Sequence, residues 1–194
     1  ALKENIVPKR DVSANVARQL RRVVGSGFVE IWGPIDEQPR DEKAYARYKN
    51  LLSSDGAKTP DLSNGRNLFM RTCGSCHKMY GQGGQIGPDL TGSNRSNTDY
   101  LLFNILNPSE EIQDDYKMVV VTTRDGRTYS GNIVGENQRQ ITMRVVGQND
   151  VVISKSSIQS KEVTPVSMMP QGLLNNLTDK ETIDLLSYLQ KANK

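Results

Sequence analysis

The sequence predicts a mostly α-helical fold with an inserted small antiparallel β domain and an N-terminal helical extension. Apolar residues recur every three or four positions towards both ends of the chain, which is the spacing of an amphipathic helix. Between residues 116 and 163 the pattern changes to short β-branched runs separated by turn residues. Because helical patterns lie on both sides of the strands, we expect the β segment to be an insertion.

Residues 1–60 are predicted to form the N-terminal helical extension. Two apolar stripes at helical spacing lie in this segment, at positions 12–23 and 44–52. A Gly-Ser-Gly sequence ends the first stripe, and Asp41 precedes the second as a helix cap. We therefore expect two short helices joined by a polar linker.

Residues 61–114 predict two helices joined by a loop. The first begins near Asp61 and carries three residues at four-residue spacing, namely Gly65, Phe69 and Cys73. Residues 78–97 are rich in Gly, Asn and Ser, which is typical of a loop. Thr98 is a candidate cap for the second helix, which must end near Pro108.

Residues 115–164 are predicted to be the inserted β domain, and residues 165–194 the return to helix. Strand patterns occur at four places, namely 118–123, 128–134, 140–146 and 151–154. An Asp-Gly pair after the first of them predicts a hairpin turn. In the last segment, Thr178 and Glu181 have the spacing of a capping box in front of a final helix.

The chain contains two cysteines and one histidine, and all three lie in Cys73-Gly74-Ser75-Cys76-His77. Cys-x-x-Cys-His is the attachment motif for c-type haem. Its spacing places both thiols on one side of a helical turn, where they form thioethers with the haem vinyl groups. The adjacent imidazole then reaches the iron. The motif predicts one covalently attached haem c, with His77 as the first iron ligand through Nε2.

Three other interpretations of the two cysteines fit the sequence less well. A thioredoxin-like dithiol expects a βαβ context, whereas this motif ends a predicted helix and opens a glycine-rich loop. A structural zinc site needs four ligands, and the chain offers three Cys and His side chains. A plain disulfide between Cys73 and Cys76 would leave the adjacent His77 without a role.

A haem-ligating histidine needs an acceptor for its Nδ1–H, because that hydrogen bond sets the orientation of the ring. The loop segment Gly87-Pro88-Asp89-Leu90 follows the motif closely, and the Pro88 carbonyl is the candidate acceptor for His77. The alternative is that Gly-Pro makes an ordinary turn.

The sixth iron ligand must be another residue type, and a Met thioether is the usual partner of His in cytochromes c. Met168 and Met169 lie in a loop ahead of the last helix. The other four methionines are too near the motif or lie on predicted strands: Met70, Met79, Met118 and Met143. We favour Met169, because Pro170 restricts the backbone directly after it. The alternatives are Met168, a ligand other than Met, or an open sixth position.

Residues 61–114 and 165–194 resemble a class I cytochrome c. Gly65-x-x-x-Phe69-x-x-x-Cys73 matches the spacing of that family's first helix, where the small glycine lets the last helix cross closely. The Gly-Pro-Asp-Leu segment and the Ser-Met-Met-Pro loop match the segments that face the two axial positions. The resemblance implies a cytochrome c fold and a His/Met-ligated haem.

The β segment within the 92 residues from His77 to Met169 resembles a narrower group, the planctomycete-type haem-binding domain family. Asn107-Pro108, Tyr116 and the Asp-Gly hairpin match the layout of that family ahead of its Met-Pro loop. The run of short strands itself looks like a small SH3- or Sm-like barrel.

These features predict a monohaem cytochrome that carries single electrons and is not an enzyme. With both axial positions filled by protein, a haem has no room for a substrate. Two alternatives follow from other uses of the same haem. An open or displaceable sixth position would make the chain a sensor or binder of CO, NO or O₂. If residues 1–60 are the end of an upstream domain of a larger dehydrogenase, the chain would be the electron-accepting module of that enzyme.

The expected partners are redox proteins. A net charge of +3 argues against a dedicated nucleic-acid surface. No apolar run has the length of a membrane span. Because haem c is attached after export in bacteria, we expect a periplasmic or otherwise extracytoplasmic protein.

Overall fold

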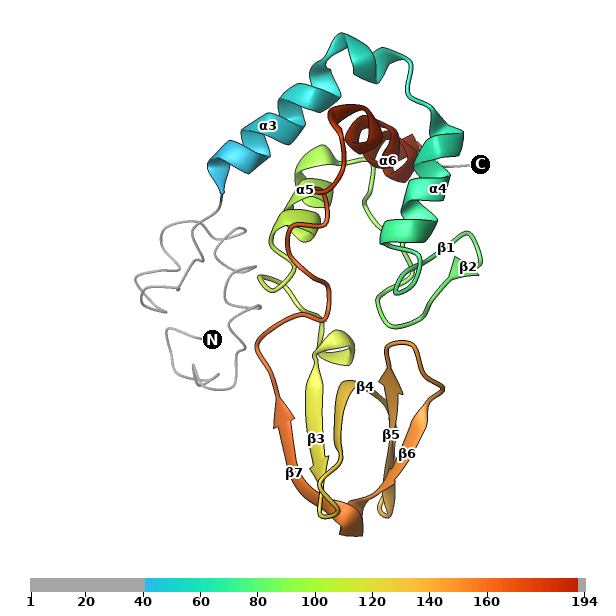
Figure 1. Cartoon of the computed structure of the whole chain (residues 1–194), viewed down its shortest axis with the longest axis vertical. Helices are drawn as coiled ribbons and strands as arrows, with labels where there is room; N and C mark the ends of the chain where they lie inside the picture. Colours follow the sequence, from blue (N-terminus) through green and yellow to red (C-terminus); the bar gives the residue numbers. More distant parts are fainter. Residues whose placement is uncertain (1–40, 192–194) are drawn as a thin grey trace, which may run out of the picture. The chain divides into compact units, whose positions relative to one another are not determined.

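The computed structural model describes residues 41–191, which contain four α-helices and two antiparallel sheets (Figure 1). The helices are α3 (Glu42–Ser53), α4 (Leu62–Thr72), α5 (Thr98–Leu106) and α6 (Asp179–Lys191). Three short 3-10 helices are η2 (Asp55–Lys58), η3 (Asp114–Tyr116) and η4 (Lys155–Ser157). The predicted helix at 12–23 lies outside the described residues.

Local side-chain hydrogen bonds begin each helix, as the sequence led us to expect. Asp41 and Asp61 accept from the backbone N–H groups three residues ahead and cap α3 and α4. The capping box is confirmed: the Thr178 N–H donates to the Glu181 carboxylate at 2.9 Å. The predicted cap Thr98 is wrong by one residue, because Asn97 accepts from the Tyr100 N–H and Thr98 is the first residue of α5.

The core of the helical part lies where α4 crosses α6. A Cβ placed on Gly65 would overlap the Asp184 carbonyl oxygen and lie 2.6 Å from Tyr188 Cβ, so the crossing requires glycine. The Phe69 and Tyr188 rings meet beside it, with centroids 5.9 Å apart. The fully enclosed aliphatic side chains of this core are Leu68, Leu102, Leu174, Leu185, Leu186 and Leu189. The expected close crossing is therefore confirmed.

Helix α3 is part of the same body as the cytochrome-like segments. Its Tyr48 is 1% exposed and belongs to the helical core. Residues from Asp41 onward form one compact unit, which includes α3. This packing could not be predicted from the sequence, because the apolar stripe of α3 is short and its partners are distant in the chain.

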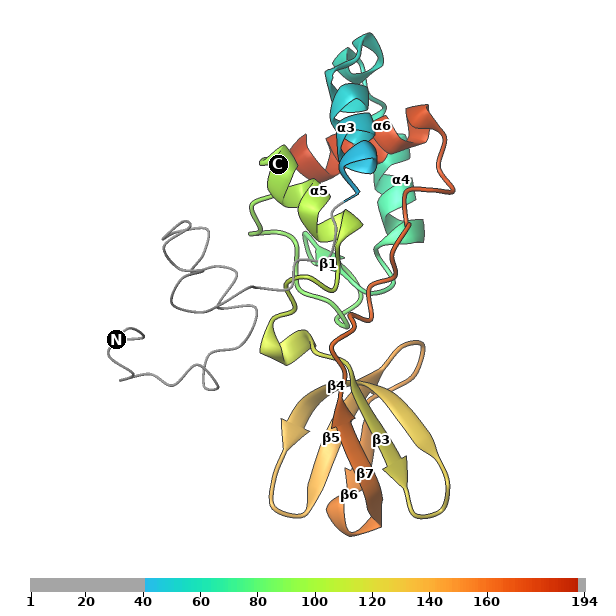
Figure 2. The same ribbon diagram turned by 90° about the vertical axis from the view of Figure 1, so that its left-hand side faces the viewer.

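Five of the strands form one antiparallel sheet, which Figures 1 and 2 show as a group separate from the four helices. They are β3 (Val119–Thr123), β4 (Thr128–Glu136), β5 (Gln140–Val145), β6 (Val151–Ser154) and β7 (Ile158–Val163). Their order is β6-β5-β4-β3-β7. Because the sheet is not closed between its edge strands, the predicted SH3- or Sm-like barrel is not confirmed.

The alternating pattern that predicted the strands describes the inner face of this sheet. Val121, Ile141 and Met143 are fully enclosed there, and Gly126 takes the positive φ of +85° that the hairpin turn requires. Strand β7 was not predicted. As an edge strand with five of its six residues exposed, it shows no alternation of apolar and polar residues.

A buried carboxylate on α6 joins the last helix to the start of α4. Asp184 is 1% exposed and accepts hydrogen bonds from the Asp61 N–H at 2.9 Å, the Asn64 amide at 3.0 Å and Lys180 Nζ at 2.5 Å. Burial alone would raise the pKa of Asp184, but these donors outweigh it and lower the pKa below its usual value.

We expect Asp184→Asn to lower the free energy of unfolding by about 1–3 kcal/mol at neutral pH, because an amide cannot accept all three donors. Since the folded-state pKa of Asp184 is lowered, its stabilisation is present above the unfolded pKa of about 3.9 and is lost as the pH falls below that value. Urea unfolding of both proteins from pH 7 to pH 3 measures this. The difference in free energy of unfolding between the two proteins should become smaller below about pH 4. A difference that stays constant with pH would contradict the proposed contribution of the ionised Asp184 carboxylate.

Candidate functional site

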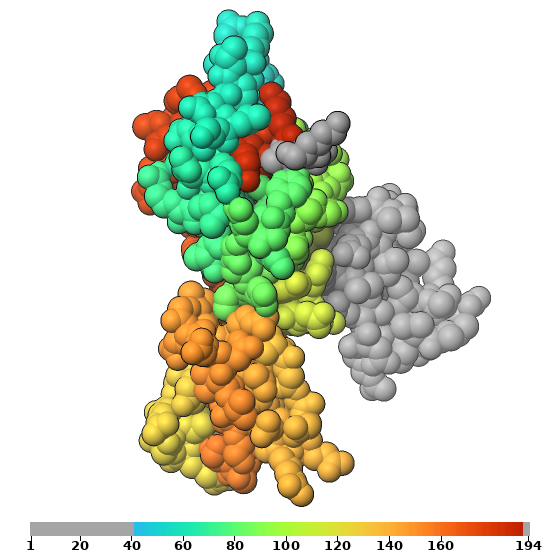
Figure 3. All heavy atoms as spheres, turned by 90° about the vertical axis from the view of Figure 1, so that its right-hand side faces the viewer, coloured from blue at the N-terminus to red at the C-terminus, as the bar shows by residue number. Residues whose placement is uncertain are grey.

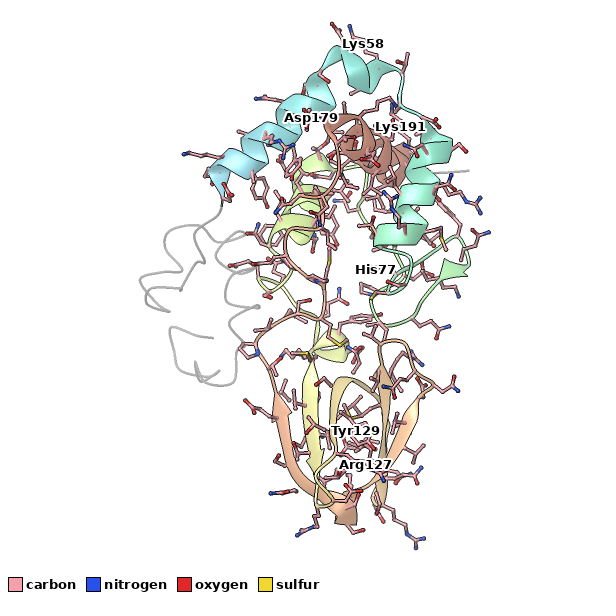
Figure 4. All side chains as sticks on the ribbon, in the orientation of Figure 1. Lys58, His77, Arg127, Tyr129, Asp179 and Lys191 are labelled. Carbon is pink, nitrogen blue, oxygen red and sulfur yellow. The ribbon has the colours of Figure 1, made fainter. Side chains whose placement is uncertain are left out.

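Helix α4 delivers the Cys-x-x-Cys-His motif at its C-terminal end. Cys73 caps the helix, and its N–H donates to the Phe69 carbonyl at 2.8 Å. One further turn follows, in which the N–H groups of Cys76 and His77 donate to the Cys73 carbonyl at 3.1 and 2.9 Å. His77 therefore follows the two cysteines at the end of α4, and Figure 4 shows it close to the C-terminal end of that helix.

Both cysteines have free thiols and are half-buried. Burial raises the pKa of the Cys73 thiol to about 12, and the neighbouring Cys76 adds to this effect. Cys73 also packs against the helical core. Within residues 41–191, no three His, Cys, Asp or Glu side chains gather to hold a metal ion, so the motif does not have the geometry of a zinc site.

The imidazole of His77 is held on one side by the segment that follows the motif. Its Nδ1 lies 2.9 Å from the Pro88 carbonyl oxygen. Burial lowers the pKa of His77, and the hydrogen bond to Pro88 opposes this shift. A neutral ring that donates through Nδ1 has its lone pair on Nε2, which is the atom that a haem iron binds.

Glycines allow that segment to press against the motif. A Cβ on Gly87 would lie 2.7 Å from His77 Nδ1, and one on Gly84 would overlap the Ser75 carbonyl oxygen. The Gly87 N–H donates to the Cys76 carbonyl at 2.9 Å. The segment includes a small hairpin of β1 (Lys78–Met79) and β2 (Gln82–Gly83) inside the predicted loop. The glycine richness was visible in the sequence, but the contact with the imidazole was not.

Arg95 ties the same segment to the last helix, and sequence reasoning missed it. The side chain is 4% exposed and donates to the carbonyl oxygens of Leu90 at 2.5 Å and Thr91 at 3.1 Å. It also donates to the Leu189 carbonyl in α6 and to the Tyr80 hydroxyl. Three of these acceptors are backbone carbonyls, which no sequence pattern reveals.

The methionine loop reaches the same helical core from the far end of the chain. Of its two methionines, Met169 packs against the core cluster. The Met169 N–H donates to Ser167 Oγ at 3.1 Å, and the Ser167 N–H donates to Ser109 Oγ at 3.1 Å, which anchors the loop next to α5. Met79 and Met143 are enclosed in the helical core and the sheet core respectively.

The donor set and its surroundings fit a covalently bound haem. Two free thiols and an imidazole with its Nδ1 engaged stand at the end of one helix. Cys73 and Met169, which are far apart in sequence, border the same apolar cluster together with Leu90 and Leu106. Such an apolar margin suits the face of a porphyrin ring. This arrangement defines a haem-binding protein of the c type.

The comparison with known families agrees with the site. Residues 62–193 match the cytochrome c family, and the chain belongs to that family. It is therefore a haem-binding electron-transfer protein that carries covalently attached haem c and interacts with redox partners. No curated protein matches the chain.

The family also has a typical location. Cytochrome c domains are typically extracytoplasmic. None of the helices between residues 41 and 191 has the length and hydrophobicity of a membrane span.

Proposed function

We propose that the protein is a monohaem cytochrome c in which His77 and Met169 are the axial ligands and single electrons pass through the iron. The observation that carries this proposal is the hydrogen bond of 2.9 Å between His77 Nδ1 and the Pro88 carbonyl. It orients the ring and leaves Nε2 free to bind metal. The count of one haem rests on the single Cys-x-x-Cys-His motif and the single histidine of the chain.

The haem iron supplies the one-electron chemistry when it is bound. The residues of the chain hold the group and set its potential. Cys73 and Cys76 attach it, His77 is oriented by Pro88, and the anchored loop presents Met169. A thioether ligand raises the reduction potential, whereas electron donation from a hydrogen-bonded imidazole lowers it. The enclosed apolar core excludes water from one side of the site.

Because both axial positions are assigned to protein side chains, we propose that the chain alone has no enzymatic turnover. Its location is proposed to be periplasmic or otherwise extracytoplasmic.

The sheet between α5 and the methionine loop supports membership of the planctomycete-type family, in which the insertion would be a variant of the SH3- or Sm-like fold. A gas sensor with a displaceable ligand and a module of a larger dehydrogenase are the alternative functions.

We expect Met169→Ala to lower the midpoint potential and to let CO bind the ferrous protein, because the variant lacks the thioether. Optical spectra of the oxidised and reduced forms, with and without CO, measure both effects. Met168→Ala is the matched control, since it removes the same side chain one residue earlier. The control should keep the low-spin spectrum and the sulfur-to-iron charge-transfer band.

The wild-type spectrum separates the candidate functions. Low-spin bands without a CO response would support His/Met electron transfer. A high-spin or CO-responsive ferrous form would favour the gas sensor. If Met168→Ala opened the iron and Met169→Ala did not, the ligand would be Met168, and the proposed assignment would be wrong.

A further inference from the structure

The inserted sheet contacts the segment that holds His77. Arg144, on β5, donates from Nη1 to the Gln85 carbonyl oxygen at 3.4 Å. Gln85 lies two residues before Gly87, whose backbone faces the imidazole of His77. Figure 3 shows the same meeting of the turn after β5 with the segment that follows the motif.

A carboxylate holds the guanidinium of Arg144 in this position. Asp150 accepts from Nε and from Nη2 of Arg144, both at 3.1 Å, which is a bidentate pair. The pair uses one edge of the guanidinium and directs Nη1 to the Gln85 carbonyl. The hydrogen bonds from Arg144 lower the pKa of Asp150 below its usual value.

The strand that carries Arg144 is itself fixed at this point. Arg144 lies opposite Asn132 of β4, which is 3% exposed. The Asn132 amide donates to the Asp115 carbonyl at 3.4 Å in η3, the segment that leads into the sheet. The backbone of Arg144 is therefore held within the paired strands of the sheet and is not part of a connecting turn.

On the other side of the contact, the segment around Gln85 cannot move without disturbing the motif. Gly84 donates to the Gly74 carbonyl at 2.8 Å, and Gly87 donates to the Cys76 carbonyl at 2.9 Å. Pro88 then accepts from His77. Gln85 thus lies in the middle of a short segment that is bonded to the motif at both ends, so a contact at its carbonyl bears on the His77–Pro88 hydrogen bond.

We propose that Arg144 and Asp150 are positioning residues through which the inserted sheet braces the segment 84–88 and thereby the orientation of His77. This proposal rests on the proposed role of His77 as an iron ligand. The side chains of Arg144 and Asp150 are 27% and 40% exposed, so the pair adds little to overall stability. Its effect is on the geometry of the His77–Pro88 hydrogen bond, which tunes the ligand field and the potential.

The test is the double variant Arg144→Gln/Asp150→Asn, which removes the pair without changing the net charge. We expect its midpoint potential to rise, because a looser hydrogen bond to Pro88 makes His77 a weaker donor to the iron. We also expect roughly two- to tenfold faster hydrogen exchange at the Gly87 amide, the range for losing one hydrogen bond. Arg144→Lys alone keeps a positive charge beside Asp150 but lacks the bidentate fork, so it should change both quantities less than the double variant does.

A control elsewhere in the same sheet is Glu136→Gln/Lys161→Gln, which also leaves the net charge unchanged. It removes the Glu136–Lys161 pair at 3.2 Å and, with it, the Glu136–Lys155 pair at 2.6 Å. It should keep the wild-type potential and exchange. The proposal fails if the first double variant behaves like this control in both measurements. If the wild-type protein lacks His ligation, the proposed function fails. Hydrogen exchange at the Gly87 amide then still tests whether Arg144 and Asp150 hold the segment 84–88.

Discussion

His77→Ala is expected to abolish the stable low-spin haem protein. The substitution removes the imidazole whose Nδ1 is bonded to Pro88, and the chain contains no other histidine to take its place. Iron coordination contributes directly to the folded state of a metalloprotein, so its loss also lowers stability. After expression with haem-maturation machinery, the haem content and the reduced optical spectrum measure the outcome.

Ser75→Ala is the control for this experiment, because Ser75 is an exposed residue inside the same motif. It should give wild-type haem content and a wild-type spectrum. A normal low-spin spectrum in His77→Ala would overturn the assignment of the proximal ligand. Loss of haem in both variants would point to damage to the attachment reaction and not to loss of a ligand.

Gly65→Ala is expected to lower the free energy of unfolding by about 2–4 kcal/mol. The new methyl group would overlap the Asp184 carbonyl oxygen and lie 2.6 Å from Tyr188 Cβ, so α4 and α6 would have to move apart. The better helix propensity of alanine offsets only about 1 kcal/mol of this cost. Because both contacts are with α6 backbone or Cβ atoms, a rotamer change cannot relieve them.

For a chain of this size, that loss corresponds to a drop of about 5–15 °C in the thermal midpoint. Gly92→Ala is the matched control, because a Cβ on Gly92 meets no atom within 4 Å. It should unfold at the wild-type temperature. If Gly65→Ala were as stable as Gly92→Ala, the close crossing of α4 and α6 would be refuted.

Features that depend on neighbouring residues were predictable. The caps at Asp41, Asp61 and Thr178 use hydrogen bonds that span three residues, and the alternation in β5 follows directly from the geometry of a strand. The Cys-x-x-Cys-His motif is equally local, because its chemistry needs only the spacing within one turn. The cap at Thr98 failed by one position, since the adjacent Asn97 competes for the same backbone N–H.

Features that depend on contacts between residues far apart in the chain could not be predicted from the sequence. Tyr48 belongs to the helical core, and strand β7 completes the sheet, although neither has a distinctive pattern. An edge strand whose residues are mostly polar and exposed carries a weak periodic signal. A tyrosine in a short stripe looks the same whether it faces a core or a surface.

For the site, the order of residues alone was enough to identify the two thiols, the imidazole and the pair of methionines from which the proposed ligand comes. The tertiary structure alone decided that Met169 packs against the cluster that Cys73 borders, that Gly87 lies on the ring of His77, and that Arg144 reaches Gln85. The physical reason is the same in each case. Every residue has a backbone carbonyl and some surface to bury, so residue type alone does not reveal which residues meet, and the fold of the chain decides it.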